Sequence, residues 1–344
     1  MLNQVLSSAG VCLVALNLVS AQTFTDCNPL KEACPPNPAF GKGVTTCNFT
    51  NGECSVFARN LDSTIKYDKK GAKFTIKEDT NAPTIATEKY IFFGRVDVEL
   101  QAATGQGIVT AMVLQSDTLD EIDWEWLGGD TTQVQSNYLS KGDTTTYDRG
   151  DFHNVTEPLT TFHKYSIEWN KNAVQWIIDG NVVRTLKAAE VKGFPQSPMQ
   201  IKLGIWCAGG SQTEQGTVDR AGLTDFAKAP FDAYYKSVTI VDYAGGNGPA
   251  PKSVKEYVYD DNRGSADSIK VKEKDGQSNP TISKPYGGLV ILNFTATPVG
   301  TPAPGNTGSS GQGFNDDVPQ SAASRGTIQE VLIAGTLFVV YLAA

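Results

Sequence analysis

The chain has 344 residues, 40% of them hydrophobic, which is enough to bury a large core in one all-β domain with tails or in two smaller domains. Its 33 Gly and 17 Pro residues indicate many turns and few long helices. The formal net charge of -8 argues against nucleic acid or an anionic membrane surface as the main partner, because both bind basic surfaces. A neutral ligand fits this charge better.

Residues 1–21 have the layout of a secretory signal peptide. An apolar run extends from Ala9 to Val19, and Val19 and Ala21 supply the small residues of a cleavage site. The alternative, a membrane-spanning helix, requires a longer apolar run. We therefore predict a secreted protein whose mature chain begins at residue 22.

Five cysteines remain after this cleavage: Cys27, Cys34, Cys47, Cys54 and Cys207. The first four allow three connectivities, and in an oxidising compartment we favour the neighbouring pairs Cys27–Cys34 and Cys47–Cys54. A zinc site usually has closely spaced CxxC pairs, which these cysteines lack, so we predict no metal. Cys207 follows Trp206 in an apolar run, which favours a buried thiol over a nucleophile.

From about residue 71 to residue 243 the apolar residues alternate with polar ones, and Gly, Asn or Asp separate the runs. An Asp179-Gly180 pair between two such runs predicts a β-hairpin. Short strands in this number predict two packed antiparallel sheets, a sandwich or jelly roll. The predicted strands cover residues 72–77, 90–102, 107–116, 120–128, 133–140, 163–170, 173–180, 182–187, 199–207 and 234–243.

The strand predicted at residues 120–128 carries three acids on one face and three apolar residues on the other. They alternate in the order Glu121, Ile122, Asp123, Trp124, Glu125 and Trp126. On a strand the apolar set faces the core, and the acids line the opposite, concave face. A helix would scatter them around its circumference.

The spacing of these acids suits the cleavage of a glycosidic bond. With a rise of about 3.3 Å per residue, the Cα atoms of Glu121 and Glu125 lie roughly 13 Å apart. Two Glu side chains that lean together can approach the ~5 to 5.5 Å of a retaining glycosidase. Three adjacent carboxyl groups cannot all ionise cheaply, so one Glu can serve as a nucleophile while another holds a proton. A solvated acidic edge and a calcium site are the alternatives, and both fit the alternation less well.

Beyond residue 243 the alternation ends. We predict an extended, O-glycosylated spacer over residues 246–325 that is rich in Pro, Gly, Ser and Thr. Small residues around Ser321 and an apolar tail from Val331 then form the layout of a glycosylphosphatidylinositol (GPI) attachment signal, with Ser321 as the attachment residue and residues 326–344 as the propeptide. A tail anchor is the alternative. Sequons at Asn48, Asn154 and Asn293 predict N-glycosylation.

The segment DEIDWEWLGGD resembles the E-x-D-x-E signature of glycoside hydrolase family 16, and in particular its fungal Crh-type cell-wall transglycosylases, which join chitin to β-glucan. The similarity extends over roughly residues 24–243 and includes the flanking segments 27–41 and 92–117. It implies a concanavalin-like β-jelly-roll catalytic domain over residues 22–245 with a concave substrate cleft.

The resemblance also implies roles for individual residues. Glu121 is the nucleophile, Asp123 assists it, and Glu125 is the general acid and base. The implied chitin contacts are Glu125, Lys202, Trp206 and Thr217. On a strand Lys202 and Trp206 share a face, so both can project into the cleft, whereas a core position is the alternative for Trp206.

We therefore expect a monomeric, wall-anchored transglycosylase that moves chitin oligosaccharides onto β-1,3/1,6-glucan without a cofactor. A hydrolytic endo-β-glucanase or chitinase on the same fold is the nearest alternative. A wall lectin or structural mannoprotein is the non-enzymatic one, because this fold carries both kinds of function. The membrane is expected as a partner only through the GPI anchor.

Overall fold

The structure is a computed structural model that describes residues 25–41, 43–59, 64–146, 148–211, 213, 215–250 and 254–273. All of these residues lie within one compact unit, Met1–Lys284. The predicted signal peptide, Asn293, Ser321 and the predicted propeptide lie outside the described residues. No helix in the described ranges is long and apolar enough to cross a membrane.

Two large antiparallel sheets build this unit. The first has seven strands in the spatial order β11 (Asp151–Asn154), β10 (Gln133–Leu139), β9 (Glu121–Leu127), β8 (Ile108–Ser116), β15 (Met199–Cys207), β6 (Thr84–Thr87) and β3 (Phe57–Arg59). The second has eight, in the order β14 (Asn181–Lys187), β13 (Ala173–Ile178), β12 (His163–Trp169), β7 (Gly94–Gln101), β16 (Phe231–Asp242), β5 (Gly71–Ile76) and β4 (Lys66–Asp68), with β2 (Val44–Asn48) paired to β16.

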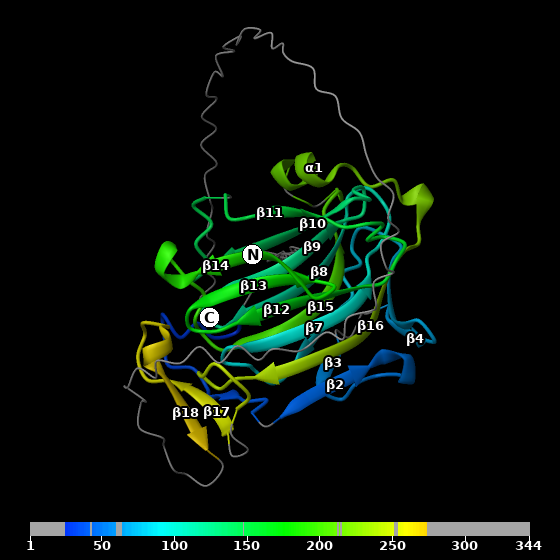
Figure 1. Cartoon of the computed structure of the whole chain (residues 1–344). Coiled ribbons are helices and arrows are strands. Elements are labelled where there is room, and N and C mark those ends of the chain that lie inside the picture. The colour runs from blue at the N-terminus through cyan, green and yellow to red at the C-terminus, as the bar shows by residue number, and fades with distance from the viewer. Residues whose placement is uncertain are drawn as a thin grey trace, which may run out of the picture. The chain divides into compact units, whose positions relative to one another are not determined.

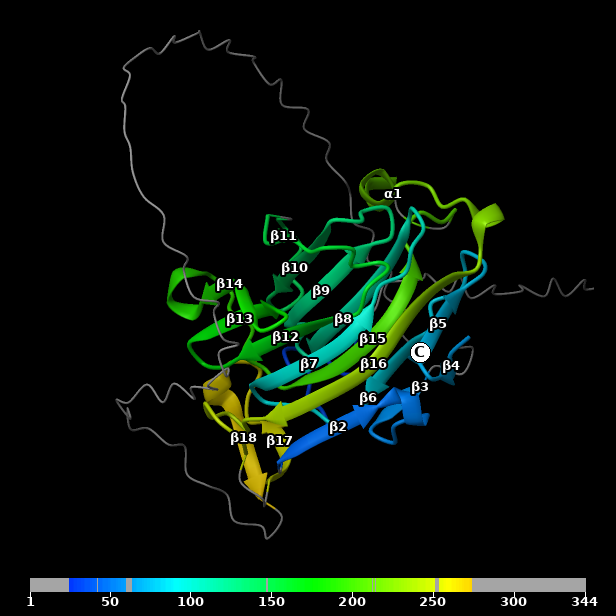
Figure 2. The same cartoon turned by 45° about the vertical axis from the view of Figure 1, so that its right-hand side comes forward.

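The two sheets lie in layers, as Figure 1 and Figure 2 show from two directions. The predicted all-β jelly roll of antiparallel sheets is therefore confirmed. Helical structure in the described residues is limited to short segments: α1 (Gln215–Ala221) and the 3-10 turns Phe49–Asn51, Ala188–Glu190, Phe226–Lys228 and Ala266–Ser268.

Aromatic side chains fill the space between the sheets next to β9. Trp124 and Trp126 are fully buried, and both contact Tyr165 of β12, with ring centroids 5.8 and 4.5 Å apart. The indole of Trp176 on β13 is also buried and donates from Nε1 to the carbonyl oxygen of Asp123, 2.9 Å away. Each buried ring of this size stabilises the fold by roughly 2–3 kcal/mol, so β9 is held firmly from its core side.

Each of the ten predicted strands overlaps an observed strand, and the predicted hairpin is present between β13 and β14. Asp179 and Gly180 both have positive φ, at 49° and 86°, as its tight turn requires. Two strand starts were wrong by three or more residues. The strand predicted from residue 234 begins at Phe231. The strand predicted from residue 90 begins only at Gly94, because Phe93 has a φ of 59° and interrupts the extended backbone.

The structure contains the disulfides Cys27–Cys34 and Cys47–Cys54, in the pairing that the sequence favoured. Cys207 is a buried free thiol, as predicted, and its Sγ lies 3.3 Å from Oγ1 of Thr224.

The start of the predicted spacer was wrong. Within residues 246–325 the chain forms β17 (Val254–Tyr259) and β18 (Ile269–Glu273). With β1 (Asn37–Pro38) they form a third, three-stranded sheet in which β17 lies between β1 and β18. Folded structure thus continues at least to Glu273. Only short alternating runs mark these strands, and Gly- and Pro-rich sequence precedes them, which is why composition suggested a spacer. The rest of the predicted spacer lies outside the described residues.

Asp242, the last residue of β16, joins the third sheet to the sandwich. One carboxylate oxygen accepts from the backbone N–H groups of Phe92 and Ala244, at 3.0 and 2.9 Å. The other accepts from the N–H of Gly41 at 2.8 Å and from the hydroxyl of Tyr257 on β17. Asp242 is only 1% exposed, so its partners would be left without this acceptor if it were removed.

We therefore expect Asp242→Ala to lower the free energy of unfolding by about 3 kcal/mol, because it strands several buried donors. Denaturant unfolding of the mature chain measures this loss. The control is Asp232→Ala at the other end of β16. It removes one hydrogen bond, from Oγ1 of Thr75 at 2.6 Å, and a partly exposed ion pair with Lys73 at 3.5 Å, so its loss should be smaller than that of Asp242→Ala. Equal losses in the two variants would contradict the special role of Asp242.

Candidate active site

Strand β9 places the three acids as the sequence predicted. Glu121, Asp123 and Glu125 point away from the core, while Ile122, Trp124 and Trp126 point into it and are fully buried. We call the side of the seven-stranded sheet that carries the acids its outer face. Glu125 is partly exposed there, whereas Glu121 and Asp123 are 8% and 2% exposed.

The register of β8 and β15 leaves space beside Glu125. Glu125 is level with Ala111 on β8, and Ala111 is level with Gly204 on β15. Ala111 and Gly204 have no long side chain, so nothing at these two positions projects far above the sheet next to Glu125. A bulky ligand can approach this acid from the side of β15.

Burial and mutual repulsion divide the protons among the acids. Burial, followed by the charges of Glu125 and Glu121, raises the pKa of Asp123 well above its usual value, and the positive charge of Arg184 opposes this only in part. Oδ1 of Asp123 has no hydrogen-bond partner within the described part of the chain. The raised pKa favours the protonated form of Asp123 beside its two acidic neighbours.

Glu125 is poised between its two protonation states. Desolvation, and then the negative charge of Glu121, raises the pKa of Glu125 to about 7, while the charge of Arg220 on α1 lowers it. A carboxyl group with this pKa can give a proton in one step and take one in the next. The arrangement thus meets the electrostatic requirement for a general acid and base.

Two predicted ligand contacts lie on the outer face with the acids. Lys202, on β15, is level with Val113 of β8, which is level with Asp123, and its side chain is buried. Trp206, further along β15, is half-buried on the same face and not in the core. Its Nε1 is buried without a hydrogen-bond partner in the residues that the structure describes.

Thr217 comes from a different element. It is half-buried on α1, and its hydroxyl accepts a hydrogen bond from Nη2 of Arg220 at 3.3 Å. Because Arg220 also acts on the pKa of Glu125, α1 contributes to the electrostatics of this site. The sequence indicated Thr217 only through the family resemblance and did not indicate Arg220.

Phe152 on β11 was also missed. It is level with Gln135 of β10, which is level with Glu125, so its side chain lies on the outer face. It is 52% exposed. Phe152 and Trp206 lie on opposite sides of β9 and offer two apolar surfaces on the face that carries the acids. Strand register revealed this position, which no local motif marks.

Asn154, a predicted glycosylation site, is exposed on the same strand as Phe152. It lines a cavity of about 680 Å³ together with Thr104, Thr131, Thr132, Val155, Thr156, Glu157, Leu159 and Thr160. Asn48 is likewise exposed, and its Oδ1 accepts from the backbone N–H and hydroxyl of Thr50. Both described sequons are thus accessible at the surface.

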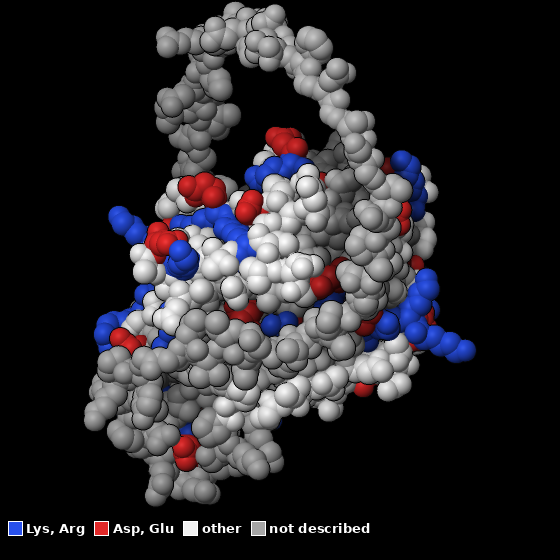
Figure 3. Space-filling model, in the orientation of Figure 1, with Lys and Arg blue, Asp and Glu red and all other residues white. Residues whose placement is uncertain are grey.

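Charge on the molecule is mixed. Figure 3 shows Lys and Arg interspersed with Asp and Glu on the face that it draws. No group of three or more His, Cys, Asp or Glu side chains in the described ranges has the geometry to hold a metal ion.

Comparisons with known proteins agree with this geometry. The sequence profile of Glycosyl hydrolases family 16 matches residues 53–222. The chain is 45% identical to Crh-like protein 5 of Aspergillus fumigatus over 267 residues, which cover 76% of this chain and 66% of that protein. One of the solved structures that resemble this chain, "Crh5 transglycosylase in complex with NAG", is 46% identical, with a TM-score of 0.67 over 72% of this chain and all of that one. The chain belongs to glycosyl hydrolase family 16.

A second relative within family 16 is Crh-like protein 2 of Botryotinia fuckeliana, which is 42% identical over 82% of this chain. The chain spans somewhat less than two thirds of the length of these two Crh-like proteins, 66% and 62%. The family-16 profile includes β9, Lys202, Trp206 and Thr217. It excludes the N-terminal loop with Cys27–Cys34 and the strands β17 and β18, which this structure nevertheless folds onto the domain.

Proposed function

We propose that this family-16 chain is a retaining transglycosylase that cleaves chitin oligosaccharides and transfers them to β-glucan. The observation that carries the proposal is the alignment of Glu121, Asp123 and Glu125 on the outer face of one strand, with the pKa of Glu125 raised to about 7. The solved structure of a relative, Crh5 transglycosylase in complex with NAG, supports both the reaction and a donor built from N-acetylglucosamine.

In the first step, a carboxylate oxygen of Glu121 attacks the anomeric carbon of the donor. The glycosidic C–O bond breaks, and Glu125 gives its proton to the departing oxygen. The products are a glycosyl ester of Glu121, the released chain end and an ionised Glu125. Protonated Asp123 donates a hydrogen bond towards the nucleophile and limits the repulsion between the acids.

In the second step, ionised Glu125 takes the proton of an incoming hydroxyl group, whose oxygen forms the new bond to the anomeric carbon. The ester bond breaks and Glu121 is regenerated as a carboxylate. A glucan hydroxyl gives transfer, and water gives hydrolysis. Aromatic surfaces favour transfer when they hold an acceptor ring over the ester and exclude water, and Phe152 and Trp206 supply such surfaces.

We place this reaction outside the cell. The two disulfides and the sequons at Asn48 and Asn154 are typical of proteins that pass through the secretory pathway. The signal peptide predicted at residues 1–21 would direct the chain into this pathway. GPI attachment at Ser321, after loss of residues 326–344, would hold a monomeric enzyme at the outer face of the plasma membrane and in the cell wall.

The experiment that tests the proposal offers the mature chain a chitin oligomer as donor and a fluorescent β-1,3-glucan oligomer as acceptor. We expect labelled hybrid chains to outnumber new reducing ends. An excess of reducing ends would favour the hydrolase, and binding without any product would favour a lectin. Omitting the glucan acceptor gives the rate of hydrolysis alone.

The pH dependence follows from the pKa of Glu125. The first step needs protonated Glu125, so activity falls as the pH rises through about 7. Arg220→Gln removes a positive charge that favours ionised Glu125, so it raises this pKa and moves the loss of activity upwards by roughly 0.3 pH unit at low salt.

Rates measured across the pH range at low and high ionic strength check this shift, which high salt should reduce. Lys228→Gln is the control, because Lys228 is exposed and lies 3.6 Å from Asp225 in a separate ion pair. A downward shift in Arg220→Gln would contradict the assignment of Glu125 as the acid.

A further inference from the structure

Gln115 is a buried polar residue beside the proposed nucleophile that the mechanism above does not use. It lies on β8, is 2% exposed, and is level with Glu121 on β9. On its other side it is level with Gln200 of β15. Its side chain therefore shares the outer face with the acids.

Both ends of its amide group are engaged. Nε2 of Gln115 donates to Oε2 of Glu121 at 2.8 Å, and Oε1 of Gln115 accepts from Nζ of Lys202 at 2.5 Å. A Lys ammonium group only donates hydrogen bonds, so the amide oxygen must face Lys202. The amide NH₂ must then face Glu121, where it favours the ionised carboxylate.

Negatively charged groups stabilise the protonated form of Lys202. Burial lowers its pKa, and the charges of Glu121, Asp117 and Asp26 oppose that effect. Asp117 accepts from Nδ2 of Asn37 at 2.7 Å and from the hydroxyl of Tyr90 at 3.0 Å.

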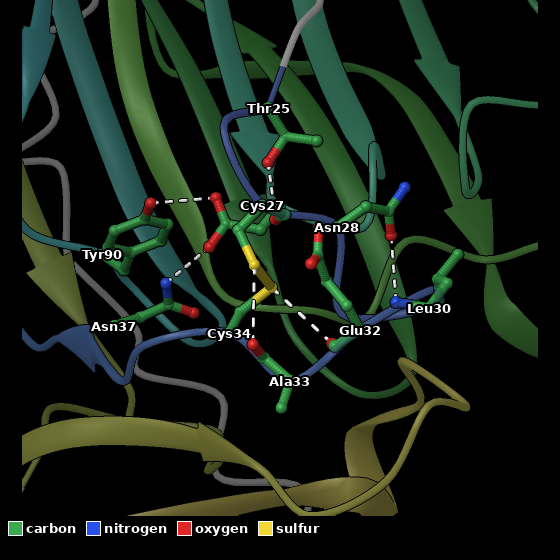
Figure 4. The surroundings of a disulfide bond; sticks show 10 residues. Thr25, Cys27, Asn28, Leu30, Glu32, Ala33, Cys34, Asn37 and Tyr90 are labelled. Carbon is green, nitrogen blue, oxygen red and sulfur yellow. Dashed lines mark hydrogen bonds between the residues drawn. A yellow bond between two sulfur atoms is a disulfide. The ribbon is translucent and has the colours of Figure 1, made fainter. Parts of the chain in front are cut away.

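Figure 4 shows Asn37 and Tyr90 beside the Cys27–Cys34 disulfide. The N-terminal loop, outside the family-16 profile, thus supports the cation that orients Gln115.

We propose that Gln115 is a positioning residue for the nucleophile, and that Lys202 fixes the orientation of the Gln115 amide. By holding Oε2 of Glu121, Gln115 fixes the orientation of the carboxylate that attacks the anomeric carbon. Lys202 prevents the amide from turning over, a turn that would place its oxygen against the carboxylate. This inference rests on the proposed function of Glu121, but the contact itself can be measured without turnover.

The test replaces Gln115 by Met, which keeps its length and removes the amide. Carbon-13 NMR of Glu-labelled mature chain, with Glu121→Gln to assign the signal, follows the titration of Glu121. Among the described residues, Glu121 interacts electrostatically with Asp123 and Glu125 of β9 and with Lys202 of β15, and Asp117 and Asp26 act in turn on Lys202. All of them are retained in the variant.

We expect the Glu121 titration to move up by about one pH unit in Gln115→Met, since a hydrogen bond to the ionised form is lost. The turnover number should fall roughly 10- to 100-fold while KM changes little, because the contact positions the nucleophile and does not bind the sugar. Gln115→Glu, which keeps the shape but adds a negative charge, should raise the titration further and serves if the Met variant does not fold.

Gln200→Met is the matched control. Gln200 is the neighbouring glutamine of the same face, but its Nε2 donates to the carbonyl oxygen of Thr87 at 2.8 Å. It should leave both the titration and the turnover number unchanged. An unshifted Glu121 titration in the Gln115 variants would overturn the positioning role. A wild-type chain that makes no product would instead overturn the proposed function, whatever the titration shows.

Discussion

Glu121→Gln reduces the formation of hybrid chains by about 10⁴-fold or more, because an amide cannot form the glycosyl ester on which both steps depend. The substitution keeps the size of the side chain, and Trp124 and Trp126 still anchor β9 in the core. The fold should therefore persist. Initial rates with the fluorescent glucan acceptor, together with thermal unfolding of the same sample, separate loss of chemistry from loss of structure.

The matched control is Glu99→Gln. Glu99 belongs to β7 of the other sheet and pairs with Lys236 at 2.8 Å near the surface. The Glu99→Gln variant makes the same chemical change on the other sheet, away from the three acids of β9, and should leave the activity intact. If Glu121→Gln retained the full biological function, the chain would act as a lectin or a structural protein, and the catalytic reading of β9 would fail.

The side of β9 that faces the core was predictable, because alternate residues of a strand point to opposite faces and only one of the two sets is apolar. Alternation of acids with Ile122, Trp124 and Trp126 decides which side is buried, since exposing two Trp side chains to water would cost several kcal/mol. The hairpin at Asp179-Gly180 was predictable for a similar reason, as its turn needs residues that tolerate positive φ. Strand alternation and turn preferences predict such features because both depend only on the residues of the segment itself.

The partners of β9 were not predictable in the same way. Gln115 reaches Glu121 only because β8 pairs with β9 in one particular register, and Phe152 reaches the outer face only through two successive pairings. A shift by one residue would turn each of these side chains to the other side of the sheet. Register between strands depends on the whole core and not on the segment that carries the residue.

The misplaced start of the spacer has a different cause. Strands β17 and β18 are short and lie beyond a Gly- and Pro-rich stretch. They pair with each other, and β17 also pairs with β1, which lies more than 200 residues earlier in the chain. Pairing over such a distance leaves little trace in local composition. The hydrogen bonds of Asp242 also join segments that are far apart in the sequence, because their donors lie around Gly41, Phe92 and Tyr257.

Glu125→Ala should separate the two chemical steps. With an unactivated chitin oligomer, turnover should fall by about 10³-fold because the departing oxygen receives no proton. With an aryl glycoside of the same oligomer the leaving group needs no acid, so the first step should stay fast. The second step then lacks its base, and the glycosyl ester on Glu121 should accumulate after an initial burst.

Azide distinguishes the roles of the two Glu residues, since this anion attacks without a base. In Glu125→Ala it should relieve the stalled second step and give a glycosyl azide with the β-configuration of the substrate, because two inversions occur. In Glu121→Ala it should replace the nucleophile and give the opposite anomer after one inversion. The same anomer from both variants would show that the assignments of nucleophile and acid on β9 are wrong.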